Sequence, residues 1–416
     1  MPAPARPHAL TPRQAWAMLL ALAGAFVLSQ AFRSLAAIMG PPLMRELSLS
    51  ASELGNWSAA YHLAFGVMQV AMGISLDVWG VRRTILLAFP LTVAGAALSA
   101  KAHSYEMLMA GQLLIGTGCS PAFLVCTVFT SRHFAPERFT AVSGTVMSIG
   151  YLGMLLTATP LAWLIERSSW RWGFAVLAGA ALAAWLLIAW RVHEPAPAPG
   201  AAPPPRASPL DALRGLLGLF KLPHTLGMVA YGMVAYASFI TIRGLWLGPL
   251  LVERAGFSLV QSGNVALAMT LASIGSPALF GRIAPSGRGR QRWLLIMAGV
   301  AAALVATLGL VQVAWVDVAL PLLYGLLSGF TVLQHGYVFE SYAPAVRGRA
   351  LSLLTMAMFL GVALMQSVSG LVAGWAPALG LEPFSAALLS MSALLLAGAA
   401  AFWWLPRAPS QSDTHR

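Results

Sequence analysis

The chain has 416 residues, of which 58% are hydrophobic and only 9% are charged, and its formal net charge is +12. Soluble domains carry about 25% charged residues, so this composition excludes a soluble enzyme or a soluble binding domain. Apolar stretches of about 20 residues, the length that a helix needs to cross a bilayer, recur along the whole chain and predict an all-α membrane protein; a β-barrel would show short alternating segments instead.

Twelve membrane-spanning helices are predicted. They cover residues 15–39, 54–76, 84–100, 105–130, 139–164, 173–191, 224–250, 261–281, 293–313, 318–340, 350–374 and 385–405. Most of the 25 Lys and Arg residues fall in the even-numbered loops and at the two ends of the chain. The positive-inside rule therefore predicts that both termini are cytoplasmic. We expect the protein to lie in the inner (cytoplasmic) membrane. The first span is too long for a signal-peptide core and is expected to be retained. Basic charge here sets orientation, and no nucleic-acid partner is predicted.

The first span contains an arginine. Arg33 has Gln30 one turn earlier on the same helical face. A guanidinium in hydrocarbon costs at least ~2.5–3.5 kcal/mol, so it is expected to face protein or a water-filled cavity. No Asp or Glu lies at a similar depth, and an anionic solute would supply the missing counter-charge. Two alternatives remain: the arginine donates to helix carbonyl groups and fastens the halves together, or its head group extends to the membrane surface.

The second span combines a histidine with paired methionines. His62 shares a face with Ser58 and Gln69, and because an imidazole titrates near neutrality it is a candidate carrier of a coupling proton. A hydrogen-bonded structural histidine is an equal alternative. Met68 and Met72 lie one turn apart, and thioether pairs favour Cu(I), although methionine also fills gaps in apolar bundles.

The loop after the second span carries a glycine-rich basic motif. It reads Gly73-Ile-Ser-Leu-Asp77-Val-Trp-Gly80-Val-Arg82-Arg83. Gly73 and Gly80 would allow close helix contact and a tight turn, Asp77 can cap a helix or pair with a basic residue, and Arg82 and Arg83 hold the loop inside.

This motif resembles the GxxxDxxGxRR signature of the major facilitator superfamily. Two further segments are similar to that family, Trp170-Arg171-Trp172-Gly173-Phe174 and Arg347-Gly348-Arg349-Ala350. The resemblance covers the whole chain. It implies twelve transmembrane helices in two pseudo-symmetric six-helix bundles and transport by alternating access.

The cysteines of the chain are both in the fourth span. Cys119 and Cys126 are separated by seven helical residues, which places them ~10 Å apart along the axis. A disulfide cannot bridge that distance. Both are predicted to be small buried side chains, with a thiolate metal pair as the alternative.

A proline-rich segment divides the chain. The predicted parts are an N-terminal six-helix bundle (1–193), a cytoplasmic linker with a short amphipathic helix (194–222), a C-terminal six-helix bundle (223–407) and a cytoplasmic tail (408–416). The linker begins EPAPAPGAAPPPRAS, which forms neither a helix nor a sheet ladder. The stretch PLDALRGLLGLFK at 209–221 is expected to lie on the membrane surface as a helix.

The two halves repeat one design. A shift of 208 overlays residues 40–73 on 248–281 without a gap, with Gly40-Pro41 on Gly248-Pro249. A parallel repeat of six spans is a known transporter plan. The Gly-Pro pairs are expected to end the first and seventh helices at an outer gate.

The seventh span repeats the intramembrane arginine. Arg243 lies two residues out of register with Arg33, on a stripe with Tyr236, Phe239 and Trp246. We expect both arginines to approach one central site, since a guanidinium binds carboxylate or phosphate oxygens in a bidentate manner and aromatic rings can stack on it. The pair is similar to that of the organophosphate:phosphate antiporter group, which implies a grip on an anion.

The tenth span carries a polar stripe. Tyr324, Ser328, Thr331 and His335 recur at i, i+4, i+7 and i+11, which favours a cavity wall. His335 is a second candidate for the coupling proton, with a structural role as the alternative.

The sequence therefore predicts a secondary transporter of a small, anionic, organic or inorganic solute, by proton symport or anion exchange. It is expected to act as a monomer in the lipid bilayer, without a cofactor and not as an enzyme, because no catalytic constellation is visible. The alternatives are a copper importer using Met68 and Met72, an efflux pump for hydrophobic compounds, and a membrane sensor.

Overall fold

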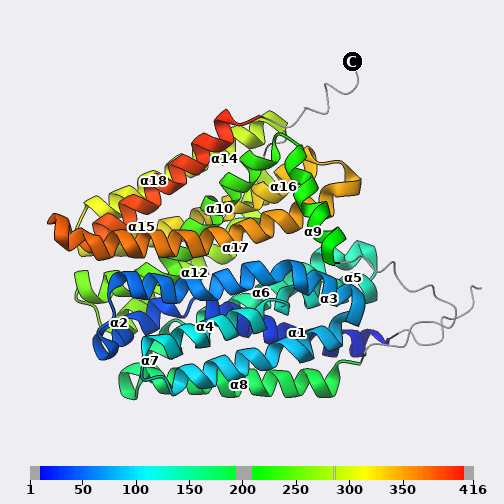
Figure 1. Cartoon of the computed structure of the whole chain (residues 1–416), viewed down its shortest axis with the longest axis horizontal. Coiled ribbons are helices and arrows are strands. Elements are labelled where there is room, and N and C mark those ends of the chain that lie inside the picture. The colour runs from blue at the N-terminus through cyan, green and yellow to red at the C-terminus, as the bar shows by residue number, and fades with distance from the viewer. Residues whose placement is uncertain (1–9, 194–208, 284, 286, 407–416) are drawn as a thin grey trace, which may run out of the picture.

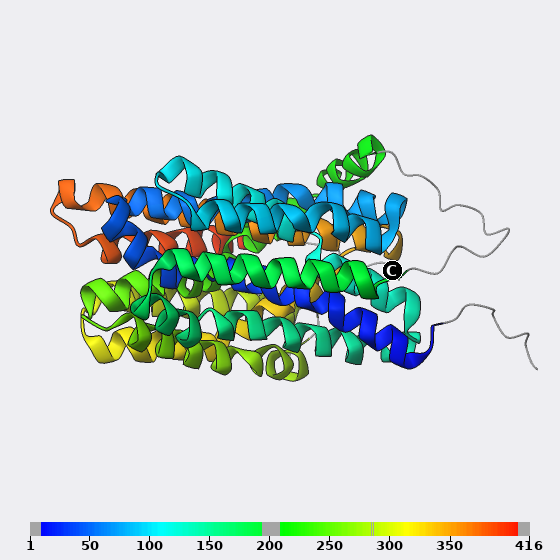
Figure 2. The same cartoon turned by 90° about the horizontal axis from the view of Figure 1, so that it is seen from below.

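A computed structural model describes residues 10–193, 209–283, 285 and 287–406, and within this part of the chain every regular element is a helix. The helices run side by side along one direction in two layers (Figures 1 and 2). In Figure 1 the first half of the chain forms the lower layer and the second half the upper layer. The predicted all-α fold of two six-helix bundles is confirmed.

The first half contains α1 (Pro12–Arg33), α2 (Ala36–Leu47), α3 (Ala51–Ala100), α4 (Tyr105–Cys119), α5 (Ala122–His133), the 3₁₀ turn η1 (Pro136–Arg138), α6 (Phe139–Leu156), α7 (Thr159–Arg167) and α8 (Trp170–Arg191). The second half begins with α9 (Pro209–Gly218), η2 (Leu219–Lys221), α10 (Thr225–Thr241), the π-helix η3 (Ile242–Trp246), α11 (Leu247–Pro249) and the π-helix η4 (Leu250–Arg254). It continues with α12 (Leu259–Ile274), α13 (Ser276–Ile283), α14 (Gly287–Leu310), α15 (Ala314–Leu327), the 3₁₀ turn η5 (Ser328–Thr331), α16 (Val332–Ser341), α17 (Pro344–Trp375), the 3₁₀ turn η6 (Ala376–Leu379) and α18 (Pro383–Trp404).

The long element α3 accounts for two of the twelve predicted spans. Eleven helical segments of the described chain are long and apolar enough to cross a membrane, and α3 alone has 50 residues, or ~75 Å as one straight helix. Gly80 interrupts it with φ 77°, a left-handed conformation that glycine adopts without a Cβ clash. The tight turn predicted at Gly80 is therefore confirmed.

The sequence repeat is visible in the helix starts. Ser50 caps α3 and Ser258 caps α12, each within a capping box, with Glu53 in the first case and Gln261 in the second. The shift between these serines is the shift of 208 found in the sequence. Because the cap satisfies the free N–H groups of the first turn, equivalent helices begin at equivalent residues in both halves.

Four of the membrane-spanning segments are interrupted within their length. The first breaks at Ser34–Leu35, the fourth at Ser120–Pro121 and the fifth at Thr157–Ala158, and the seventh contains η3. By contrast, α8, α14 and α18 are continuous. Interrupted helices leave backbone groups that need partners within protein or a cavity, and such helices form the solute sites of many transporters.

The expected helix ends at the two Gly-Pro pairs are wrong. Gly40 and Pro41 lie inside α2, and Gly248 and Pro249 lie inside α11, where the chain continues as η4. A proline lacks the backbone donor but its ring fits within a kinked or π-helical segment. The pairs instead mark a close helix crossing, described below.

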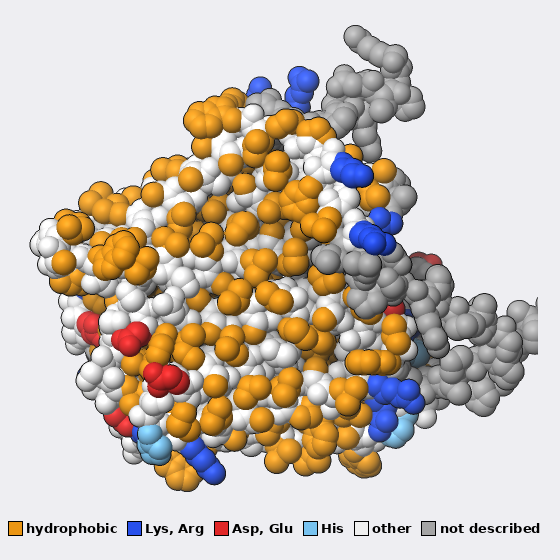
Figure 3. All heavy atoms as spheres, viewed as in Figure 1, with side chains coloured by type: hydrophobic (Ala, Val, Ile, Leu, Met, Phe, Trp, Pro, Cys, Tyr) orange, Lys and Arg blue, Asp and Glu red, His pale blue; other side chains and the backbone are white. Residues whose placement is uncertain are grey.

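Figure 3 shows a broad apolar band over the sides of the helices. Most basic side chains on this face gather at the right-hand end, toward which both ends of the described chain lie, and acidic side chains lie mainly at the left-hand end. We call these ends the terminal side and the far side. The predicted helix at 209–221 is present as α9 and η2 on the terminal side, with Leu216 and Leu219 buried; the proline-rich part of the linker and the tail lie outside the described residues.

Candidate functional site

The two bundles are pressed together on the far side. A Cβ added to Gly55 of α3 would lie 2.6 Å from the carbonyl oxygen of Gln366 and 2.9 Å from the Cα of Gly370, both on α17. Ser52 also donates a hydrogen bond to the carbonyl of Gly370 at 3.2 Å. No side chain fits at this crossing, so glycine is what allows α3 and α17 to meet.

Two other helix pairs close the same side. A Cβ on Gly248 would overlap the carbonyl of Ala37, so the second Gly-Pro pair lies where α11 crosses α2. Between α7 and α12, Thr159 donates to the side-chain oxygen of Asn264 at 2.8 Å, and Glu166 accepts from the backbone N–H of Val260 at 2.8 Å. Three helix pairs therefore seal the far side.

Toward the terminal side the same helix face loses its partner. Gly55, Gly66 and Gly73 lie on one face of α3, and a Cβ on Gly66 would contact Leu360 at 3.1 Å. A Cβ on Gly73 would meet no atom within 4 Å. The close helix contact predicted at Gly73 is wrong for this conformation, because α3 and α17 diverge beyond the middle of the molecule.

Arg33 lies at the point where this divergence begins. Its side chain is 7% exposed and donates from Nη1 to the hydroxyl of Tyr236 on α10 at 2.9 Å. Its Cζ lies 4.6 Å from the ring centre of Phe359 on α17 and 5.3 Å from that of Phe65 on α3. The cation is therefore held between the bundles by the Tyr236 hydroxyl and two aromatic rings, and the hydroxyl of Tyr61 also lies near it.

Unsatisfied polar atoms surround this cation. Nε of Arg33 and Oε1 of the buried Gln30 have no hydrogen-bond partner. His62 contacts the carbonyl of Ser58 through Nδ1 at 3.2 Å, while its Nε2 has no partner. The amide of Gln366 lies beside that imidazole, and both of its polar atoms are unpaired. Buried polar groups are rarely left unpaired without a functional reason.

Arg243 is placed differently. It is 0% exposed and lies in η3, from which Nε donates to Thr270 at 3.0 Å and Nη2 donates to the carbonyl of Met154 at 3.1 Å. Its Nη1 has no partner. Arg243 makes its hydrogen bonds on α6 and α12, whereas Arg33 bonds to Tyr236 on α10, and a Cβ on the neighbouring Gly244 would lie 3.2 Å from the carbonyl oxygen of Arg33. The expectation that both arginines approach one site stays a prediction, and the bond to Met154 also fits the alternative of a cross-bundle fastening.

Neither arginine has a carboxylate partner. Within the described part of the chain, the ion pairs of Arg171 with Glu46, Arg254 with Asp317 and Arg290 with Glu340 all lie toward the ends of the helices. Arg33 and Arg243 make none. The unpaired intramembrane charge inferred from the sequence is thus present in the folded chain.

The aromatic stripe predicted beside Arg243 is divided. Tyr236 binds Arg33, whereas Phe239 packs against Tyr324 with ring centres 6.2 Å apart. Trp246 donates to Ser369 at 2.9 Å and packs against Phe384. The π-helix accounts only for Trp246, because i→i+5 bonding adds a residue to the turn and rotates later side chains away from an α-helical face. Tyr236 and Phe239 precede it and already meet different partners within α10.

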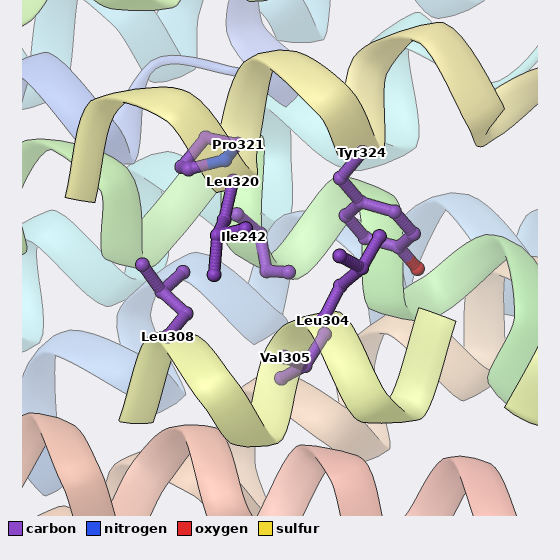
Figure 4. A pocket seen from close by; sticks show the side chains of 7 residues that line it. All are labelled: Ile242, Leu304, Val305, Leu308, Leu320, Pro321 and Tyr324. Carbon is purple, nitrogen blue, oxygen red and sulfur yellow. The ribbon is translucent and has the colours of Figure 1, made fainter. Parts of the chain in front are cut away.

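The polar stripe of the tenth span is mostly satisfied within its own surroundings. Tyr324 bonds with Ser238 and lines a small apolar cavity with Ile242, Leu304 and Pro321 (Figure 4). Ser328 donates to the carbonyl of Gly325 at 2.7 Å, and Thr331 donates to that of Ser328 at 3.0 Å. The 3₁₀ turn η5 brings these carbonyls into reach, and none of these residues contacts Arg33.

The remaining candidates lie apart from Arg33. His335 is half-buried with an unpaired Nδ1, Met68 is half-buried and Met72 is buried. Asp77 and Arg83 are exposed on the terminal side, where Arg82 donates to the carbonyl of Ala189 at 3.0 Å.

Both cysteines are free and buried, as predicted. No cluster of three His, Cys, Asp or Glu suited to a metal ion occurs among the described residues.

Sequence reasoning missed the two rings around Arg33. Phe65 and Phe359 are separated by almost 300 residues, and phenylalanine is common in apolar helices, so neither carries a local signal. Gln366 carries a weak sequence signal, since a glutamine within an apolar span needs a hydrogen-bond partner.

Comparison with known proteins agrees with the fold. The sequence profile of the Major Facilitator Superfamily matches residues 21–335. The chain is 28% identical to monocarboxylate transporter 11 of Mus musculus over 98% of this chain and 90% of that protein. It is 22% identical to the hexuronate transporter of Bacillus subtilis (strain 168), over 60% of this chain and 58% of that protein.

Solved transporters share the arrangement of helices. A bacterial homologue of the human lysosomal transporter Spinster, in an inward-facing and occupied conformation, superposes with a TM-score of 0.73 at 14% identity and covers 95% of this chain and 97% of its own. The nucleoside transporter NupG superposes with a TM-score of 0.71 at 17% identity, over 93% of this chain and 98% of its own. At these identities the likeness concerns the fold alone.

Proposed function

The chain belongs to the major facilitator superfamily and is a secondary transporter, and we propose that its solute is a small anion that binds at Arg33. The observation that carries this proposal is the guanidinium of Arg33, which is buried between the bundles against two aromatic rings and has no carboxylate partner and an unused N–H. A desolvated charge without a counter-ion is costly. A carboxylate, sulfonate or phosphate oxygen would supply both the charge and the missing acceptor.

The names of several relatives support an anion. Monocarboxylate transporter 11, the hexuronate transporter and a probable sulfoacetate transporter are each named for a solute that is negatively charged at neutral pH. Other relatives are named for glucose, and similar structures are named for nucleosides and xylose. Arg33 is what favours the anionic class for this chain, since a neutral sugar leaves the guanidinium uncompensated.

We further propose that the far side faces the periplasm, so that this conformation is open toward the cytoplasm. The seam formed by Gly55, Gly248 and Gly370 closes the far side, while the face of α3 at Gly73 is free. The basic loops lie on the terminal side, as the positive-inside rule requires of the cytoplasmic surface. Both termini would then be cytoplasmic, in an inner membrane, and the monomer would suffice for alternating access.

Arg243 has a supporting role in this proposal. Its bond to the carbonyl of Met154 joins α10 and η3 of the second bundle to α6 of the first. This bond can form only while the bundles are close at that depth, so Arg243 would stabilise the closed far side rather than bind the solute.

A thermal-shift screen tests the proposal. The purified wild-type protein is heated with lactate, glucuronate, sulfoacetate, inorganic phosphate, Cu(I) and a cationic dye, beside Arg33→Gln and Arg243→Gln. Ligand bound to the folded state raises the melting temperature by mass action.

We expect one anion class to stabilise the wild type and Arg243→Gln, but not Arg33→Gln. Stabilisation by Cu(I) or by the dye that survives Arg33→Gln would overturn the proposal and favour a metal importer or an efflux pump.

A further inference from the structure

We propose that His62 takes up the coupling proton of this transporter and does so together with the anion on Arg33. The inference rests on the proposed function and deepens it, because it names the coupling ion and the residue that carries it. The sequence left His62 and His335 as equal candidates, and the contacts of the two side chains separate them.

The first step is the state of the imidazole. His62 is 1% exposed on α3, and its Nδ1 lies 3.2 Å from the carbonyl oxygen of Ser58. A carbonyl only accepts, so Nδ1 must carry a hydrogen, and the lone pair of the neutral ring is on Nε2. Nε2 has no partner. His62 can therefore accept a proton at Nε2, and the bond from Nδ1 to Ser58 fixes the direction in which Nε2 points.

The second step is a partner for either protonation state. The amide of Gln366 on α17 lies beside the imidazole, is fully buried and has neither its oxygen nor its nitrogen paired. Its N–H can donate to a neutral Nε2, and after rotation its oxygen can accept from a protonated one. Gln366 is thus a positioning residue that suits both forms of His62.

The third step is the link between proton and anion. The imidazole stacks on the ring of Phe359 with centres 6.4 Å apart, and the guanidinium of Arg33 lies over the same ring at 4.6 Å. A proton on His62 alone would put two cations around one ring in a low-dielectric interior, where they repel strongly. An anion on Arg33 removes that repulsion, so each ligand strengthens the binding of the other.

The charge balance leads to a stoichiometry. The empty site carries the single positive charge of Arg33. With one monovalent anion on Arg33 and one proton on His62, the site again carries a single positive charge. The loaded and empty carriers would therefore cross the membrane potential with equal charge, and transport of a monovalent anion with one proton would be electroneutral.

Besides Arg33, the titratable groups near His62 are two tyrosines and a cysteine. Tyr61 of the same helix lies edge-on at 5.0 Å between ring centres, and Tyr236 of α10 packs edge-on against Phe359 at 6.0 Å. Cys119 of α4 lies near the hydroxyl of Tyr61. Arg33 of α1 is the charged neighbour, and α17 supplies Phe359 and Gln366, which do not titrate. His335 makes no contact with Arg33 or with Phe359.

The experiment separates coupling from binding in proteoliposomes. Labelled lactate, glucuronate and sulfoacetate are first tested for exchange against unlabelled anion without a pH gradient, and the probe whose exchange depends on Arg33 is retained. Accumulation of that probe is then driven by a pH gradient in the wild type, His62→Gln and His335→Gln. A membrane potential imposed with valinomycin tests electroneutrality.

We expect His62→Gln to lose at least about tenfold of the gradient-driven accumulation relative to its own exchange rate, and His335→Gln to keep the wild-type ratio of accumulation to exchange. Wild-type exchange that no pH gradient accelerates, or accumulation lost in His335→Gln and kept in His62→Gln, would overturn the inference while the anion proposal stands. If no anion is exchanged, or if Arg33→Gln exchanges it as fast as the wild type, both the anion proposal and the proton inference are overturned.

A second variant guards against misfolding of His62→Gln. Gln366→Met preserves volume but removes the acceptor for a protonated Nε2. We expect it to move the half-maximal accumulation to a more acidic pH. An unchanged pH profile in Gln366→Met, together with full coupling in a folded His62→Asn, would contradict the inference.

Discussion

Arg33 and Arg243 occupy similar positions in the two halves, and both are buried inside the membrane-spanning part of the chain. Two of the three guanidinium nitrogens of Arg243 donate hydrogen bonds, one to Thr270 and one to the carbonyl of Met154. Arg33 donates one hydrogen bond, from Nη1 to the hydroxyl of Tyr236, and its guanidinium lies over the rings of Phe65 and Phe359. The difference teaches that a buried charge is a poor guide to a solute site until its hydrogen bonds are counted.

The largest expected effect comes from removing each charge in turn. Arg33→Gln should reduce anion transport about 10–100-fold, since a charge-assisted hydrogen bond contributes about 1.5–3 kcal/mol, and should leave the melting temperature unchanged or higher, because a buried uncompensated cation is lost. Arg243→Gln should instead lower the free energy of unfolding by about 1–3 kcal/mol, because buried partners are left unpaired. Its melting temperature should fall accordingly. Initial rates and thermal melts of both variants check this. Equal effects on both properties would erase the distinction between the arginines.

A substitution at the helix crossing beyond Arg243 tests whether the seam governs access to Arg33. Gly248→Val would overlap the carbonyl of Ala37 only while the far side is closed. An overpacking cost of about 1–3 kcal/mol should shift the population toward the far-side-open state and slow transport about tenfold. Labelling of a reporter cysteine at Ala162, which is buried beside Gly263 between α7 and α12, should accelerate in parallel. Gly73→Ala is the matched control, since its Cβ meets no atom, and a similar loss of transport in that variant would contradict the assignment.

A smaller effect is expected from the hydroxyl that orients Arg33. Tyr236→Phe keeps the ring but removes the acceptor 2.9 Å from Nη1. A typical hydrogen bond contributes about 0.5–1.5 kcal/mol, so the dissociation constant of the anion should rise about 2–10-fold. Equilibrium binding measures this, with Tyr324→Phe as the control because that hydroxyl bonds with Ser238. Tighter binding in Tyr236→Phe would mean that the tyrosine competes with the solute for Arg33.

The smallest effect should come from breaking the ion pair of Arg171 with Glu46, in which the arginine has a carboxylate partner. The hydrogen bond from Arg171 lowers the pKa of Glu46. A lowered carboxyl pKa stabilises the folded state above the unfolded pKa and loses this contribution as pH falls through the folded value. Both side chains are partly exposed, so Glu46→Gln should cost at most about 1 kcal/mol at pH 7. Melting curves of wild type and Glu46→Gln should converge below about pH 4. A difference that persists there would assign the effect to packing.

Much of the fold followed from local chemistry. Span length, the repeat of 208 and the capping serines depend on neighbouring residues, and Gly80 turns because glycine alone tolerates its conformation. The burial of Arg33 and Arg243 also followed, since apolar sequence surrounds both. The domain boundaries within the linker stay a prediction, because part of that segment lies outside the described residues.

The tertiary structure decided what the sequence left open, namely which groups each buried charge meets. Phe65, Phe359 and Tyr236 reach Arg33 from three helices that are distant in sequence, and His62 joins them only because α3 and α17 cross at Gly55 and Gly370. The π-helix around Arg243 placed Trp246 off the expected aromatic stripe. Periodicity reports which face of a helix is buried, whereas the partner on that face depends on how the bundles pack, which no single span encodes.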